Sequence, residues 1–179
     1  MRLGIISDTH DDVENVRAAI DIFNQKEVET VIHAGDYIFP GIVKEFGRLN
    51  AKLVGVLGNN DGEKGHLLKN FLDVGGALKG ELGELQIEDL KIGIYHGTSE
   101  AIKDLLVKSG NYNILVCGHT HKREPSGISK GKYQNDGGTL VLNPGTAHRK
   151  VDSLSGAFLE GGVIILDTKS KEYFNIDLP

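Results

Sequence analysis

Short apolar runs recur along the chain, and several of the segments between them have helical periodicity. The runs cover residues 3–6, 31–34, 53–57, 92–95, 114–117, 140–142 and 163–166. Because several runs do not alternate between apolar and polar residues, we expect strands that are buried on both faces. Strand and helix patterns alternate over roughly the first 60 residues, which predicts parallel strands joined by right-handed crossovers.

Four segments place apolar residues at helical spacing. The apolar positions are Val13, Val16, Ile20 and Phe23 in the first segment, Ile42, Val43, Phe46 and Leu49 in the second, Leu67, Leu68, Phe71 and Leu72 in the third, and Ile102, Leu105 and Leu106 in the fourth. Asp11 or Asp12 suits the N-cap of the first helix, and Pro40 suits the first turn of the second. Thr98 or Ser99 is expected to cap the fourth helix.

The second half of the chain has a different pattern. Residues 81–95 predict a hairpin with its turn at Glu88 and Asp89, and residues 139–178 predict strands joined by polar turns. Alternation over residues 173–178 predicts an edge strand, which could pair with another chain in a homodimer. Since the sequence contains no linker or internal repeat, we expect one α/β domain over residues 1–179, with two packed sheets flanked by helices.

Composition excludes several classes of protein. The net charge of −5 gives no overall attraction to nucleic acid or to an anionic membrane. Cys117 is the only cysteine, which excludes an internal disulfide and fits the reducing cytoplasm. No apolar run approaches the roughly 18 residues of a membrane span. We therefore expect a cytoplasmic protein that binds neither membranes nor, stably, nucleic acid.

Candidate chemistry is concentrated directly after the predicted strands. Asp8 and His10 follow the first strand, Asp36 the second, Asn59 and Asp61 the third, His96 the fourth, His119 and His121 the fifth, and Asn143-Pro144-Gly145 the sixth. Each of these residues alone has an ordinary structural explanation, such as a helix cap, a turn residue or a buried histidine. Because the carboxyl ends of strands in an open α/β sheet form a ligand crevice, the whole set favours a metal site.

The types of ligand narrow the choice of metal. Imidazole, carboxylate and amide groups without thiolate favour Mn²⁺, Fe²⁺, Zn²⁺, Ni²⁺ or Co²⁺ over Mg²⁺ or Ca²⁺. The candidate ligands exceed what one ion needs, whereas two ions about 3.5–4 Å apart, bridged by one carboxylate, would use them all. Two dications opposed by Asp8, Asp36 and a hydroxide keep a positive charge, which suits an anionic phosphoryl group.

The order and spacing of these residues resemble the calcineurin-like metallophosphoesterase superfamily. The matching blocks are Asp8-x-His10, Gly35-Asp36, Gly58-Asn59-x-Asp61, His96-Gly97 and Gly118-His119-Thr120-His121. The short chain and its Asn143-Pro144-Gly145 block are similar to the small bacterial and archaeal phosphodiesterases, a group related to the retromer metallophosphoesterase-like subunit. The resemblance implies a four-layer αββα sandwich of two mixed sheets flanked by helices.

The resemblance also implies a role for each matching residue. One ion would be held by Asp8, His10, Asp36 and His121, and the other by Asp36, Asn59, His96 and His119, with Asp36 bridging. A hydroxide activated by both ions would attack phosphorus in line, while Asp61 would orient a neighbouring group. Manganese is expected first, with nickel, cobalt, iron and zinc as alternatives.

One position departs from the superfamily pattern. The commoner motif has a histidine where this chain has Asn60, and that histidine is thought to protonate the leaving oxygen. An amide cannot act as a general acid at neutral pH. Another group or water would then supply the proton, or the enzyme would favour good leaving groups. Arg149 follows the Asn143-Pro144-Gly145 block and is a candidate for gripping phosphate with its guanidinium fork.

We therefore expect a metal-dependent phosphohydrolase that acts on small phosphodiesters, among which nucleotides are one class. The expected catalytic residues are Asp36, Asn59, Asn60, Asp61 and His96. A phosphomonoesterase and a non-catalytic interaction scaffold of the same fold remain alternatives. A scaffold is free to lose ligands, whereas every matching position here carries a competent one.

Overall fold

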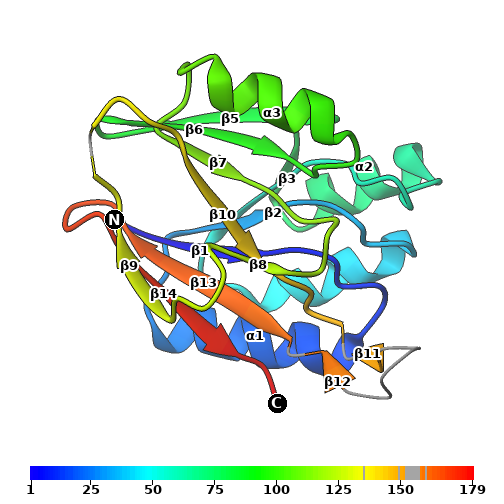
Figure 1. Cartoon of the computed structure of the whole chain (residues 1–179). Helices are drawn as coiled ribbons and strands as arrows, with labels where there is room; N and C mark the ends of the chain where they lie inside the picture. The colour runs from blue at the N-terminus through cyan, green and yellow to red at the C-terminus, as the bar shows by residue number, and fades with distance from the viewer. Residues whose placement is uncertain (135, 149, 152–157, 160) are drawn as a thin grey trace.

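Two β-sheets stacked face to face organise the chain, and helices cover the outer face of each sheet (Figure 1). The structure is a computed structural model that describes residues 1–134, 136–148, 150–151, 158–159 and 161–179. The four layers confirm the predicted αββα sandwich.

The larger sheet has seven strands. Their order is β4 (Ala77–Leu78), β3 (Lys52–Gly55), β2 (Thr30–His33), β1 (Arg2–Ile6), β13 (Gly162–Asp167), β14 (Glu172–Asp177) and β9 (Lys130–Lys132). Strands β1 to β4 are parallel, as strand–helix alternation predicted, and β13, β14 and β9 continue the sheet in antiparallel pairs. The parallel half therefore points all its carboxyl ends toward one edge.

The smaller sheet has five strands. Their order is β5 (Leu82–Ile87), β6 (Leu90–Tyr95), β7 (Ile114–Val116), β10 (Leu140–Pro144) and β8 (Arg123–Glu124). The β5–β6 hairpin is the one predicted over residues 81–95, and β6, β7 and β10 run parallel. Strands β11 (Lys150–Val151) and β12 (Phe158–Leu159) form a separate two-stranded ribbon.

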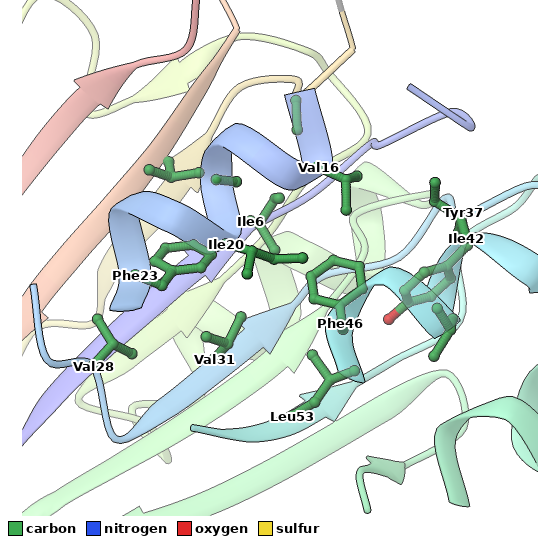
Figure 2. Close-up of a cluster of buried hydrophobic side chains, with 14 of the residues drawn as sticks. Ile6, Val16, Ile20, Phe23, Val28, Val31, Tyr37, Ile42, Phe46 and Leu53 are labelled. Carbon is green, nitrogen blue, oxygen red and sulfur yellow. The ribbon is translucent and has the colours of Figure 1, made fainter. Parts of the chain in front are cut away.

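Three helical segments cover the larger sheet. They are α1 (Val13–Gln25), the 3₁₀ helix η1 (Pro40–Arg48) and α2 (Lys64–Asp73). Asp12 caps α1 by accepting a hydrogen bond from the Asn15 amide, at 3.0 Å. Figure 2 shows Val16, Ile20 and Phe23 of α1 packed with Val31 of the sheet.

A second apolar core fills the space between the sheets. Leu3 and Ile5 of the larger sheet contribute to the same cluster as Ile92, Ile94 and other apolar residues of the smaller sheet. Residues alternate between the two faces of a strand, so Ile6 joins the cluster under the helices instead. Burying each such side chain stabilises the fold by about 1.5–3 kcal/mol. The continuous apolar runs are thus explained by burial on both faces.

The prediction that residues 173–178 form an edge strand was wrong. Strand β14 pairs with β13 on one side and with β9 on the other. Strand β9 is only three residues long, has the sequence Lys-Gly-Lys, and carries no apolar pattern that would mark it as a strand. Gly131 allows the close approach, because a Cβ at this position would collide with the Tyr173 ring.

Two predicted helices differ in detail. The segment after Pro40 winds as a 3₁₀ helix, and it contains two glycines, which have low α-helical propensity. Helix α3 (Glu100–Lys108) covers the smaller sheet, yet Ile102 and Leu105 of its apolar stripe are 47% and 67% exposed. Lys103 is buried instead, and its ammonium donates to the Glu124 carboxylate at 2.8 and 3.0 Å. None of the described helices is long and apolar enough to cross a membrane.

Candidate metal centre

The polar residues predicted from the sequence meet at the carboxyl ends of the parallel strands. The loops after β1, β2 and β3 carry Asp8, His10, Asp36 and Asn59, and the loops after β6 and β7 carry His96, His119 and His121. Backbone and side-chain hydrogen bonds join the two edges. The Asp8 carboxylate accepts from the His119 amide at 3.0 and 3.2 Å, and the His96 ring binds the Ala34 carbonyl at 2.7 Å.

Asp8, His10 and His121 form the first cluster. Each offers one ligand atom, and these atoms all lie within 4.8 Å of one another. His121 Nε2 is 3.1 Å from Asp8 Oδ1, and His10 Nε2 is 3.7 Å from the same oxygen. His10 Nε2 also lies 3.6 Å from Asp36 Oδ2, which brings Asp36 to the edge of this cluster.

Asp36 and His96 form a second cluster with Asp8. Their ligand atoms also lie within 4.8 Å of one another, and all three residues are buried. His96 Nε2 is 3.4 Å from Asp36 Oδ2 and 3.1 Å from Asn59 Oδ1. The His119 ring lies 5.3 Å from the His96 ring, centroid to centroid. All seven predicted ligands are therefore brought to one place.

Left-handed backbone geometry directs many of these side chains. Positive φ angles occur at Asp8 (53°), His10 (42°), Asp36 (61°), His119 (68°) and His121 (55°). Such geometry costs a residue with a side chain about 1–3 kcal/mol, although Asp and His accept it more readily than most. Strain repeated at five neighbouring positions is typical of a functional site that the rest of the fold holds in place.

Two glycines allow the loops to approach one another. A Cβ on Gly58 would collide with the Asp36 carboxylate, and a Cβ on Gly118 would lie 2.5 Å from Asp8 Oδ2. These contacts explain the glycine that precedes Asn59 and the one that precedes His119. Both were noted in the sequence, but which carboxylate each one faces is visible only in the structure.

Asp61 fixes the loop that carries Asp36. Its two carboxylate oxygens accept hydrogen bonds from the amides of Asp36, Tyr37, Ile38 and Gly58, at 2.7–3.0 Å. Asp61 is buried, and hydrogen bonds to a charged acceptor are stronger than neutral ones. It lies behind the ligands and holds the β2 and β3 loops together.

His33 and Thr9 support the site, and sequence reasoning did not assign them to it. The Gly35 amide donates to His33 Nδ1 at 3.1 Å, so His33 Nε2 carries the proton and donates to Thr9 Oγ1 at 3.2 Å. Thr9 in turn donates to the Asp36 carbonyl at 3.4 Å. Burial lowers the pKa of His33 to about 3, so the ring stays neutral. The one signal for this role in the sequence is a histidine inside the apolar run 31–34, two residues before Gly35.

The end of β10 and the segment that follows it support both sheets. Asn143 donates to the Gly118 carbonyl at 2.8 Å, and its own oxygen accepts from the Gly145 amide at 2.9 Å. Thr146 donates to the Asp8 carbonyl at 2.9 Å. His148 brings a further ring to this rim, 5.8 Å from the His10 ring. Arg149, the predicted phosphate-binding residue, lies outside the described residues.

Burial and charge together set the ionisation of the ligands. Burial alone would raise the pKa of Asp8, but the facing His10 and His121 rings outweigh it and lower that pKa well below its ordinary value. Asp36 follows the same balance, because His96 and Asn60 donors overcome burial and lower its pKa. Burial would lower the pKa of His96, whereas the Asp36 carboxylate raises it above its usual value. Both carboxylates are therefore ionised at neutral pH, as metal ligands must be.

The residues present fit a divalent cation. His10 Nε2 is buried and, within the part of the chain that is described, has no hydrogen-bond partner, yet it faces Asp8 and Asp36. The Ala34 carbonyl accepts the Nδ1 proton of His96, so Nε2 is the nitrogen directed at Asp36 and the one that would give up its proton to bind a metal. Imidazole nitrogens prepared in this way beside two carboxylates form a metal-binding arrangement.

Known proteins with this fold have related activities. Residues 1–171 match the calcineurin-like phosphoesterase superfamily domain. The chain is 39% identical over 179 residues to a phosphodiesterase of Methanocaldococcus jannaschii, with 99% of each chain covered. The solved structure of an archaeal phosphodiesterase has a TM-score of 0.83 at 39% identity and covers 99% of this chain and 100% of its own.

More distant structures share the fold alone. Vacuolar protein sorting 29 of Cryptosporidium parvum has a TM-score of 0.65 at 18% identity, with 98% of this chain and 96% of that chain covered. The chain belongs to the calcineurin-like phosphoesterase superfamily, as its motifs predicted. Membership implies divalent metal ions, and the two Asp and His clusters are the groups that could hold them.

Proposed function

We propose that this member of the calcineurin-like phosphoesterase superfamily is a phosphodiesterase with a binuclear metal centre, and that residues 1–179 act as one domain. The observation that carries the proposal is the pair of Asp and His clusters. They share Asp8, and Asp36 of the second cluster lies 3.6 Å from His10 of the first and 3.4 Å from His96. The 39% identical phosphodiesterase of Methanocaldococcus jannaschii supports the choice of diesters over monoesters.

The proposed ligand sets follow the two clusters. Asp8, His10, Asp36 and His121 hold one ion, and Asp36, Asn59, His96 and His119 hold the other. Ligands of nitrogen and oxygen without sulfur suit Mn²⁺ first, with Ni²⁺, Co²⁺, Fe²⁺ and Zn²⁺ as alternatives. When bound, two such ions supply an activated water and positive charge for the phosphoryl oxygens.

The chain itself orients these ligands and keeps both carboxylates ionised. His96 keeps its Nδ1 proton on the Ala34 carbonyl, so its other nitrogen stays available for a metal. Asp61 accepts from the amides of Asp36 and Gly58, which fixes the loop that carries the proposed bridging carboxylate of Asp36. Asn60 donates from its backbone amide and from its side chain to the two Asp36 oxygens, at 2.9 and 2.8 Å.

Asn60 therefore acts on the bridging carboxylate in this proposal. Its side-chain amide cannot act as a general acid at neutral pH, so water or another group must protonate the leaving oxygen. Diesters with good leaving groups need the least help from an acid. We expect such diesters to be the best model substrates.

Hydrolysis of bis(p-nitrophenyl) phosphate by metal-stripped protein tests the proposal. The reaction is run with Mn²⁺ added or withheld, beside p-nitrophenyl phosphate as the monoester. Asp36→Asn is the matched variant, because it keeps the shape of the side chain but removes the shared charge. We expect Mn²⁺-dependent cleavage of the diester that the variant lowers by at least about 100-fold.

Three outcomes would contradict the proposal in different ways. Faster cleavage of the monoester would assign a phosphomonoesterase. Full activity of Asp36→Asn would exclude Asp36 as the bridging ligand. Tight metal binding with no turnover under Mn²⁺, Ni²⁺ or Co²⁺ would favour a non-catalytic scaffold.

A further inference from the structure

Phe39 lies beside the metal centre with most of its side chain in solvent. It is 65% exposed and is the only mostly exposed phenylalanine or tyrosine among the residues whose side chains the structure describes. It follows Asp36 by three residues, and its amide donates to the Asp11 carboxylate at 2.9 Å. Asp11 is next to His10, so Phe39 lies where the loops of two candidate ligands meet.

The backbone that presents Phe39 is fixed. Asp61 accepts from the amides of Tyr37 and Ile38, directly before Phe39, at 2.7 and 3.0 Å. Ile38 has a φ angle of 72°, which is unfavourable for a β-branched residue and persists only where surrounding contacts impose it. The backbone that carries the exposed ring is therefore held at a defined place by a rigid loop.

Folding does not explain the ring. Phe39 occupies the N-cap of η1, where Ser, Thr, Asp or Asn would supply a hydrogen bond, and it makes no side-chain cap. It belongs to none of the three apolar clusters that the described residues form. Its ring lies against Gly41, where an added Cβ would come within 2.9 Å of Phe39 Cδ1. The chain thus leaves space for an aromatic side chain that it does not bury.

We propose that Phe39 is a specificity-determining residue whose ring stacks on a flat aromatic substituent of the phosphoryl substrate, such as an aryl group or a nucleobase. Stacking on an exposed ring accepts any flat aromatic group and needs no further polar partner. The proposal rests on the proposed function, because it takes the phosphoryl group to bind at the metal centre. It adds the class of substituent that the site prefers.

Binding of two simple phosphonates tests the proposal without turnover. Methylphosphonate and phenylphosphonate carry the same metal-binding group and differ only in the apolar substituent. Their dissociation constants are measured by titration calorimetry on Mn²⁺-loaded protein. We expect wild-type protein to bind phenylphosphonate about 5- to 30-fold more tightly, and Phe39→Ala to lose this preference while its affinity for methylphosphonate is unchanged.

Two further variants serve as controls. Phe39→Tyr keeps the ring and should keep the preference. Leu105→Ala removes a side chain of similar exposure, 67%, on α3 and should change neither constant. Equal losses for both ligands in Phe39→Ala, or no loss for either, would overturn the proposal. Failure of wild-type protein to bind methylphosphonate would overturn the proposed function, and this inference with it.

Gly41→Ala provides a second test that keeps the aromatic residue. The new Cβ would displace the Phe39 ring from its place, and since the ring is exposed it can move at little cost. We expect weaker binding of phenylphosphonate and unchanged binding of methylphosphonate. An unchanged preference for phenylphosphonate would show that the observed position of the ring is not the one that binds substrate.

Discussion

The two sheets contribute to the metal centre in different ways. The larger sheet supplies both carboxylates, Asp8 and Asp36, and its loops are held by contacts of their own, through Asp61 and His33. The smaller sheet supplies only imidazoles, and the loop that carries His119 is fastened to Asp8 on the larger sheet. The larger sheet thus forms an acidic half that is braced within itself, whereas the imidazole half is fastened both to Asp8 and to Asn143 of its own sheet.

Gly118→Ala should break the contact between the two halves and have the largest effect. The new Cβ would collide with Ser7 Oγ and with Asp8 Oδ2, which are both buried. Overpacking of this kind costs about 3 kcal/mol, which lowers the melting temperature by roughly 6–12 °C. Metal affinity should fall by more than tenfold, because Asp8 belongs to both clusters.

Gly65→Ala is the matched control for this substitution. Gly65 lies in α2 with no atom within 4 Å of an added Cβ, so the variant should be slightly more stable than wild type. Thermal unfolding of both variants measures the change in melting temperature, and Mn²⁺ titration measures the change in metal affinity. Wild-type metal affinity in Gly118→Ala would show that the halves do not depend on this contact.

Asp61→Asn should loosen the acidic half alone. The variant keeps one acceptor oxygen but turns an amide group toward backbone amides that also donate, so about 2 kcal/mol of stability should be lost. Denaturant unfolding measures this loss, and Mn²⁺ affinity should fall with it. Asp73→Asn removes an exposed carboxylate that pairs, among the described residues, with Lys69, and should stay within about 0.5 kcal/mol of wild type. Equal stabilities of the two variants would contradict the role of Asp61.

His33 gives the same half a dependence on pH. Its pKa is about 3 in the folded protein against 6.5 in the unfolded chain, so the unfolded state binds more protons between these values. Stability is therefore complete above pH 6.5 and declines as the pH falls toward 3. From pH 7.5 to 5.5 this one group should lower the free energy of unfolding of metal-free protein by about 1 kcal/mol. Denaturant titrations at the two pH values measure the free energy of unfolding. Between pH 7.5 and 5.5 it should fall by this amount more for wild type than for His33→Gln. An equal fall in both proteins would refute the assignment.

Asn60→His should have the smallest effect of these substitutions. It tests whether protonation of the leaving oxygen limits turnover. An imidazole at this position can donate a proton, so turnover of an alkyl diester should rise about tenfold more than turnover of a nitrophenyl diester. Asn60→Ala controls for the lost contact with Asp36 Oδ2. Equal changes on both substrates would show that proton donation does not limit the reaction.

The sequence predicted the fold class well because burial leaves a readable pattern. Apolar runs identified β1, β2, β3, β6, β7, β10 and β13, and the strand ends identified the positions of the candidate ligands. It missed β9, whose Lys-Gly-Lys sequence has no apolar face, and so residues 173–178 were taken for an edge. On α3 the apolar stripe includes Ile102 and Leu105, which the structure leaves exposed, while it buries Lys103. The error arises because helical spacing defines a stripe but not which neighbour covers it.

What the sequence determined by itself is the set of groups that can bind a metal and the edge of the sheet where they occur. Strand periodicity and strand ends are local properties, and local properties can be read along a chain. Only the tertiary structure decided which groups meet, because the two clusters combine residues from both sheets. It also decided the supporting contacts of Asp61, His33 and Gly118, since a hydrogen bond or a close approach between distant loops depends on how the sheets pack.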